Sequence, residues 1–136
     1  MIKILLVEDS KFLRLATERA LARAGYEVSS TADGSEVLRV AREKLPNLIL
    51  LDMLLPKMSG PDVLKALKSD PVTKAIPVVV MTGLSQKNAA RLVEDGAVGF
   101  LEKGDLALDK GPEKLLTALQ DILKKLPGEH AHATTA

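Results

Sequence analysis

Residues 48–52 read Leu-Ile-Leu-Leu-Asp, an uninterrupted apolar run that ends in a carboxylate. Apolar residues at consecutive positions are typical of a strand whose sheet is covered on both faces, so residues 48–51 predict a buried strand of a parallel sheet. Four other short segments predict strands, at residues 2–7, 26–30, 76–81 and 97–101. The chain therefore carries five candidate strands.

Helical patterns separate these strands. They begin at Ser10, at Asp33, at residues 59–61, at Ser85 and at Pro112. They end near residues 24, 45, 67, 96 and 126, with the fourth running through Leu92. Asp33 and Glu36 form a capping-box pattern, and Gly25 is expected to stop the first helix. Five strands alternating with five helices predict an α/β fold, a doubly wound parallel sheet. We expect one domain over residues 1–126 and a flexible tail over residues 127–136.

Composition excludes several chemistries. The 136 residues include no cysteine, and the two histidines, His130 and His132, lie in the expected tail. The sequence therefore argues against thiolate metal sites, disulfides and histidine-containing catalytic triads. Lys plus Arg number 19 and Asp plus Glu number 18, which disfavours nucleic acid or a membrane surface as a partner. No export signal or membrane span is recognisable, so we expect a cytoplasmic location.

Polar residues stand where the predicted strands end. Glu8 and Asp9 follow the first strand, Asp52 the third, Thr82 the fourth and Lys103 the fifth. Carboxyl ends of parallel strands meet at one edge of a sheet, where ligands bind. Three converging carboxylates repel one another, and Mg²⁺ with oxygen ligands relieves that repulsion. Carboxylates, a hydroxyl, a lysine and a magnesium ion suit phosphoryl transfer, with Asp52 able to act as the nucleophile.

Four segments carry a resemblance to a known family. They are Leu-Leu-Val-Glu-Asp-Ser at 5–10, Leu-Leu-Asp-Met-Leu-Leu-Pro-Lys-Met-Ser-Gly at 50–60, Val-Met-Thr-Gly at 80–83 and Gly-Ala-Val-Gly-Phe-Leu-Glu-Lys at 96–103. In these segments the sequence resembles the receiver domains of two-component response regulators, the chemotaxis-regulator-like proteins. The resemblance implies the flavodoxin-like strand order 2-1-3-4-5, which is the documented order of that family.

The resemblance also implies roles for individual residues. Glu8 and Asp9 match the acid pair that holds Mg²⁺, and the backbone carbonyl of Met53 matches a further metal ligand. Asp52 matches the phosphoacceptor. The implied phosphoryl donor is a histidine kinase or a histidine phosphotransfer protein.

Further residues match the switching parts of the family. Thr82 resembles the hydroxyl that moves toward the phosphoryl group, Lys103 the lysine that contacts it, and Phe100 the aromatic whose rotamer follows the switch. The implied output is a changed surface over the fourth helix, fifth strand and fifth helix, which binds an unidentified downstream protein. Apolar positions of the last helix are also compatible with a homodimer.

Departures from the family pattern add two expectations. Gly104 stands where many members have proline, and the connection over residues 104–111 is longer than expected. Leu54 and Leu84 are bulky apolar residues at positions that flank the path of hydrolytic water in the family. They predict slow autodephosphorylation, so the chain is expected to be a phosphoacceptor and not an enzyme with turnover.

Other functions remain open from the residues alone. A constitutive interaction domain of the same fold would keep the acids without receiving phosphate. An aspartyl-phosphate hydrolase would share the nucleophile, but such enzymes place a second Asp where this chain has Leu54. A flavin-binding module is disfavoured because no Ser/Thr-rich phosphate loop follows the first strand, where Glu8 and Asp9 would repel a phosphate.

Overall fold

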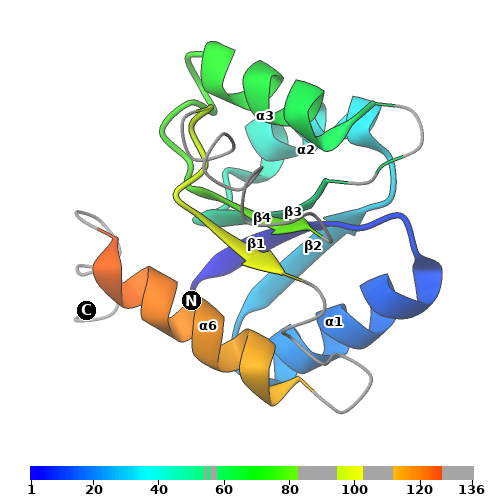
Figure 1. The fold of residues 1–136 in the computed structure, drawn as a ribbon, viewed down its shortest axis with the longest axis vertical. Helices are drawn as coiled ribbons and strands as arrows, with labels where there is room; N and C mark the ends of the chain where they lie inside the picture. Colours follow the sequence, from blue (N-terminus) through cyan, green and yellow to red (C-terminus); the bar gives the residue numbers. More distant parts are fainter. Residues whose placement is uncertain (54, 56–57, 83–94, 103–111, 127–136) are drawn as a thin grey trace.

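Five parallel strands form one sheet in the order β2-β1-β3-β4-β5 (Figure 1), as expected. The computed structural model describes residues 1–53, 55, 58–82, 95–102 and 112–126. The strands are β1 (Lys3–Val7), β2 (Glu27–Thr31), β3 (Leu48–Asp52), β4 (Val78–Thr82) and β5 (Gly99–Glu102). The chain crosses over at β1, which lies between β2 and β3, so this is the point where the strand order reverses.

Helices cover both faces of the sheet (Figure 1). The four helices in the described ranges are α1 (Lys11–Arg23), α2 (Gly34–Lys44), α3 (Gly60–Ser69) and α6 (Glu113–Lys125). Helices α2 and α3 lie on one side, and α1 and α6 lie on the other. The expected helix over residues 85–92, the connection over 104–111 and the expected tail over 127–136 lie outside the described residues.

Two apolar clusters explain why the strands are apolar at consecutive positions. Side chains alternate across a strand, so Ile49 and Leu51 of β3 join the cluster beneath α2 and α3, while Leu48 and Leu50 join the cluster beneath α1 and α6. All four side chains are fully buried. Burial of one such leucine contributes about 1.5–3 kcal/mol, so the central strand is a main source of stability.

Strand boundaries differ from the sequence prediction by one or two residues. Tyr26 belongs to the turn after α1, because its N–H donates to the Leu21 carbonyl, and β2 runs one residue later than expected. Ile76 and Pro77 precede β4, because the Ile76 N–H donates to Thr73. Asp52 and Thr82 lie inside the ladder as the last residues of their strands.

Side-chain caps begin three of the helices at the carboxyl edge of the sheet. Ser10 Oγ accepts from the Leu13 N–H at 3.3 Å, and Ser59 Oγ accepts from the Asp62 N–H at 3.3 Å. Asp33 caps α2 as predicted by accepting from the Ser35 N–H at 2.9 Å. Each cap contributes about 1 kcal/mol and fixes where its helix begins.

The reciprocal half of the predicted capping box at α2 is wrong. The Asp33 N–H donates to Thr31 Oγ1 at 3.2 Å, and the Glu36 carboxylate pairs with Arg39 on the exposed side of the helix. Arg39 pairs with both Glu36 and Glu43, and the hydrogen bond that Arg39 donates to Glu36 raises the pKa of the guanidinium. The nearby arginine competes for the carboxylate that would otherwise reach back to the helix start.

Leu45 ends α2 in a left-handed conformation, with φ 48° and ψ 59°. An L-residue pays about 1–2 kcal/mol for this conformation and glycine does not. We expect Leu45→Gly to be more stable than Leu45→Ala by about 1 kcal/mol, because both remove the side chain and only glycine relieves the backbone. Urea unfolding of the two variants measures the difference, and the reverse order would contradict a strained helix end.

None of the helices in the described part of the chain is long and apolar enough to cross a membrane.

Candidate functional site

The acid pair stands at the crossover point of the sheet. The Glu8 N–H donates to the Thr31 carbonyl at 3.1 Å, which extends the β1–β2 ladder by one step beyond Val7. Glu8 is 2% exposed, and Asp9 is exposed. The first acid is therefore fixed by the sheet, while the second faces the solvent.

Asp52 is the third acid of this edge. It is the last residue of β3, lies opposite Met81 of β4 in the ladder, and is 1% exposed. One carboxylate oxygen from each of Glu8, Asp9 and Asp52 lies within 4.8 Å of the other two. The structure thus brings together the three carboxylates that the sequence placed at one edge.

Met53 and Gly60 shape the loop that follows Asp52. The Met53 N–H donates to the Met81 carbonyl at 3.0 Å, and the Met53 carbonyl accepts from the Gly60 N–H at 3.2 Å. A Cβ on Gly60 would lie 2.4 Å from Met53 Cα. The loop after β3 can therefore fold back onto its own strand end only because residue 60 is glycine.

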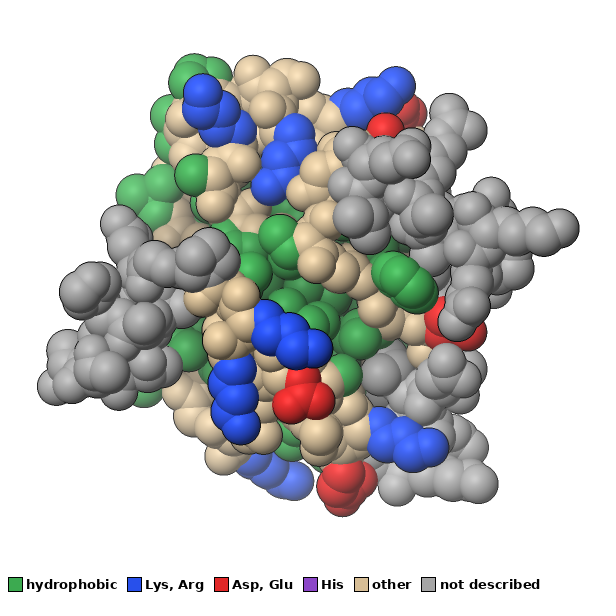
Figure 2. All heavy atoms as spheres, turned by 60° about the vertical axis from the view of Figure 1, so that its left-hand side comes forward, with side chains coloured by type: hydrophobic (Ala, Val, Ile, Leu, Met, Phe, Trp, Pro, Cys, Tyr) green, Lys and Arg blue, Asp and Glu red, His purple; other side chains and the backbone are tan. Residues whose placement is uncertain are grey.

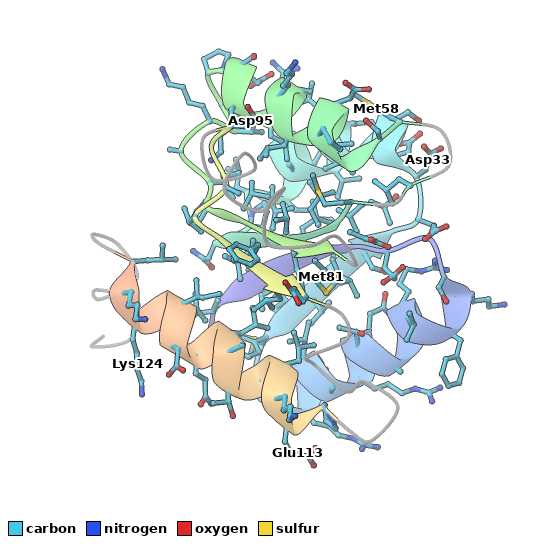
Figure 3. The ribbon with its side chains drawn as sticks, in the orientation of Figure 1. Asp33, Met58, Met81, Asp95, Glu113 and Lys124 are labelled. Atoms are coloured by element: carbon cyan, nitrogen blue, oxygen red, sulfur yellow. The ribbon has the colours of Figure 1, made fainter. Side chains whose placement is uncertain are left out.

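The loop after β2 packs against the loop after β3 at the same edge. Figure 3 shows Asp33 and Met58 close together there, with Asp95 at the other end of the sheet. A Cβ on Gly34 would lie 2.6 Å from the Met58 carbonyl oxygen, so α2 begins in close contact with this loop.

Three hydrogen bonds hold the β1–α1 loop. The sequence predicted one of them, the Ser10 cap of α1, and it did not predict the other two. The Ser10 N–H also donates to the Glu8 carboxylate at 3.2 Å. Arg14 donates from Nη1 to the main-chain carbonyl of Glu8 at 3.0 Å. An arginine one turn into a helix gave no distinctive signal, because most such residues are solvated.

The start of α1 also carries an exposed aromatic ring. Phe12 lies three residues after Asp9 and is 80% exposed. Lys11 and Leu15, on the same part of the helix, are exposed as well. The first turns of α1, which follow the acid pair in the chain, therefore carry exposed apolar and basic side chains.

The remaining predicted residues lie on β4 and on or after β5. The main chain of Thr82 ends β4 and pairs with Glu102 of β5. Phe100 of β5 is partly buried and packs against the cluster beneath α2 and α3. Lys103 follows β5 directly, outside the described residues.

Lys68 is the notable titratable group away from this edge. Its ammonium donates to the carbonyls of Lys74 at 3.1 Å and Ile76 at 2.9 Å, and burial lowers its pKa. A Cβ on Gly96 would lie 2.9 Å from the Lys68 stem. The ammonium of Lys68 thus binds the turn before β4, and its stem packs against the turn before β5, at the opposite end of the sheet from the acids.

The chain matches the family model described as the response regulator receiver domain over residues 4–120. It therefore belongs to the receiver-domain family of two-component response regulators. Domains of this family are phosphoacceptors and not classical enzymes. They are phosphorylated by histidine kinases or phosphotransfer proteins, and they bind Mg²⁺ in an acidic site.

Relatives agree with this assignment. The chain is 35% identical over 101 residues to the polar-differentiation response regulator DivK of Brucella anthropi, covering 74% of this chain and 82% of DivK. It is 40% identical over 102 residues to the response regulator PleD of Caulobacter vibrioides, covering 74% of this chain and 22% of PleD. The chain thus spans about a fifth of the length of PleD.

Solved structures show the same fold. The chemotaxis response regulator CheY4 of Vibrio cholerae matches with a TM-score of 0.80 and 33% identity, over 90% of this chain and 98% of CheY4. A Mn²⁺-bound form of the response regulator Rcp1 matches with a TM-score of 0.64 and 33% identity, over 76% of this chain and 81% of Rcp1. The protein therefore has the CheY-like flavodoxin fold.

Proposed function

We propose that this protein accepts a phosphoryl group on Asp52 with Mg²⁺ held at the acid cluster, and that the phosphorylated form presents a changed protein-binding surface. The observation that carries the proposal is the meeting of the Glu8, Asp9 and Asp52 carboxylates within 4.8 Å at the crossover edge of the sheet. Open α/β sheets bind ligands at this position.

The residues of the cluster fit a magnesium ion. The donor set is made of carboxylate oxygens, with the Met53 carbonyl as the proposed fourth protein ligand, and hard divalent cations prefer oxygen. Asp9 is exposed, so the proposed site is open to water, which Mg²⁺ gives up reluctantly. The Mn²⁺-bound form of Rcp1, a 33% identical relative, supports a divalent cation at this edge.

Asp52 is the proposed nucleophile because it is a carboxylate fixed by the ladder. One of its oxygens attacks phosphorus, the bond from phosphorus to the donor's imidazole nitrogen breaks, and the electron pair leaves with that nitrogen. The metal ion, when bound, neutralises charge on the phosphoryl oxygens. Thr82 and Lys103 are the proposed hydrogen-bond and charge partners of those oxygens.

The proposed output involves the far edge of the sheet. Among the described residues, strand β5 pairs with β4 alone, and Phe100 lies on β5. Figure 2 shows the face that carries the amino end of β5 and the carboxyl end of α6, where apolar side chains gather between lysines and arginines. Val98 is 44% exposed next to this strand. Such a surface suits a protein partner, and movement of Phe100 is the proposed link to it.

The proposed lifetime of the phosphoryl group depends on residues outside the described ranges. Leu54 and Leu84 support slow autodephosphorylation, because bulky apolar side chains obstruct water. This remains a prediction from the sequence.

Metal removal tests the proposal. Incubation with acetyl phosphate and Mg²⁺ is expected to give a single phosphoryl adduct by intact-mass spectrometry. The adduct should be lost on treatment with hydroxylamine, which cleaves acyl phosphates. Addition of EDTA before acetyl phosphate is expected to abolish labelling, because three carboxylates without a cation repel the incoming phosphoryl group. Equal labelling with and without EDTA would contradict a metal-dependent site.

A further inference from the structure

Arg14 contacts the peptide bond between the two acids. Its Nη1 donates to the main-chain carbonyl oxygen of Glu8 at 3.0 Å, and this carbonyl belongs to the peptide unit that joins Glu8 to Asp9. Arg14 is partly buried on α1 and points back toward the end of β1. The contact therefore reaches from the helix to the strand end, across the loop that carries the acids.

Holding this carbonyl restrains the main chain that carries both acidic side chains. A peptide unit is planar, so fixing its carbonyl oxygen fixes the plane that joins the Cα atoms of Glu8 and Asp9. The other side of Glu8 is already held, because its N–H donates to Thr31 at 3.1 Å. Asp9 is exposed and ends no strand, and the Arg14 contact restrains the peptide unit on its amino side.

The helix itself fixes Arg14 relative to the loop. The Arg14 N–H donates to the Ser10 carbonyl at 2.8 Å, and the Ser10 N–H donates to the Glu8 carboxylate at 3.2 Å. Glu8, Ser10 and Arg14 thus form a closed ring of three hydrogen bonds around Asp9. These hydrogen bonds hold the loop in the conformation in which the carboxylate oxygens of Glu8 and Asp9 lie close together in the metal-free chain.

The contact of Arg14 is made with a main-chain atom. Its Nη1 donates to the Glu8 carbonyl oxygen, so this hydrogen bond does not occupy a carboxylate oxygen of the acid cluster.

We propose that Arg14 is a positioning residue for the magnesium site: its hydrogen bond to the Glu8 carbonyl orients Glu8 and Asp9 for metal binding. The inference rests on the proposed function for the presence of a magnesium site at the acid cluster. Groups that orient metal ligands typically change metal affinity by about 10- to 100-fold.

Three variants separate this role from general stability. Arg14→Met keeps the length of the stem and removes the donor and the charge. Arg14→Lys keeps the charge with a single donor group. Arg19→Met removes an exposed arginine from the same helix and is the matched control. Isothermal titration with MgCl₂ measures the Kd of each folded variant, and thermal unfolding measures its stability.

We expect Arg14→Met to weaken Mg²⁺ binding by about tenfold, Arg14→Lys to recover part of that loss, and Arg19→Met to bind as the parent chain does. In the metal-free chain, amide hydrogen exchange at Asp9 and Ser10 should become faster in Arg14→Met and stay unchanged in Arg19→Met. A folded Arg14→Met variant with unchanged Kd and unchanged exchange would overturn the proposal. If Arg14→Met does not fold, an Arg14→Lys variant with unchanged Kd and unchanged exchange overturns it instead.

The two proposals fail in different ways. If the parent chain binds no Mg²⁺, the proposed metal site is wrong, and the exchange measurement still shows whether Arg14 orders the loop. If the parent chain binds Mg²⁺ and all variants bind equally, only the role of Arg14 is wrong.

Discussion

Asp52→Asn is expected to abolish phosphoryl labelling by acetyl phosphate. Asparagine has the same size and keeps one oxygen at the end of β3, but an amide cannot form an acyl phosphate. Asp52 is 1% exposed inside a regular ladder, so the substitution changes charge without removing packing. Intact-mass spectrometry after incubation with Mg²⁺ and acetyl phosphate gives the result directly.

Two control variants make this result specific. Asp62→Asn changes an exposed carboxylate on the first turn of α3 and should label as the parent chain does. Asp9→Asn removes a proposed metal ligand and not the nucleophile, so its labelling should fall at low Mg²⁺ and recover as Mg²⁺ is raised. An Asp52→Asn chain that still gains the adduct would show that another residue is the phosphoacceptor.

Gly60→Ala is expected to destabilise the fold by about 3 kcal/mol, the upper end of typical overpacking costs. The added Cβ would lie 2.4 Å from Met53 Cα and 2.9 Å from the Met53 carbonyl oxygen. Backbone atoms cannot move aside as a flexible side chain can, so the loop after β3 must shift. The shift would also displace the Met53 carbonyl, and Mg²⁺ affinity should fall together with stability.

Gly99→Ala is the matched control. Its Cβ would lie 3.5 Å from Ile122 Cδ1, an ordinary contact with a movable methyl group. Urea unfolding should therefore show a change of less than about 1 kcal/mol for Gly99→Ala and a much larger one for Gly60→Ala. Similar losses for both variants would mean that the tight approach to Met53 is not what requires glycine at position 60.

The sheet was predictable because its central strand is apolar at several consecutive positions, each of which indicates a buried strand. Residues 48–51 are apolar at every position, and each of these side chains is buried, so small errors in strand ends did not change the architecture. The ends themselves were less predictable. The starts of β2 and β4 lie one and two residues later than expected, while Asp52 and Thr82 end β3 and β4 as expected, because backbone hydrogen bonds continue regardless of side-chain polarity.

The acidic residues of the candidate site were predictable, because a carboxylate at a strand end is itself a possible metal ligand. Three acids at strand ends indicated a cluster, and the structure brings their oxygens together. The contacts that hold the cluster were not predictable. Arg14 donates to a main-chain carbonyl and Gly60 to the Met53 carbonyl, and such bonds depend on loop shape, not on the identity of the accepting residue.

The three acids are unequally buried, and this bears on which of them a protein partner can touch. Asp52 and Glu8 are 1% and 2% exposed, so a broad protein surface cannot touch them. Under the proposed function, a phosphoryl donor would therefore have to reach Asp52 with a projecting side chain. Phe12, 80% exposed at the start of α1, is accessible to such a partner. Substitutions at Phe12 are then expected to change the choice of partner and to leave the labelling of Asp52 by acetyl phosphate unchanged.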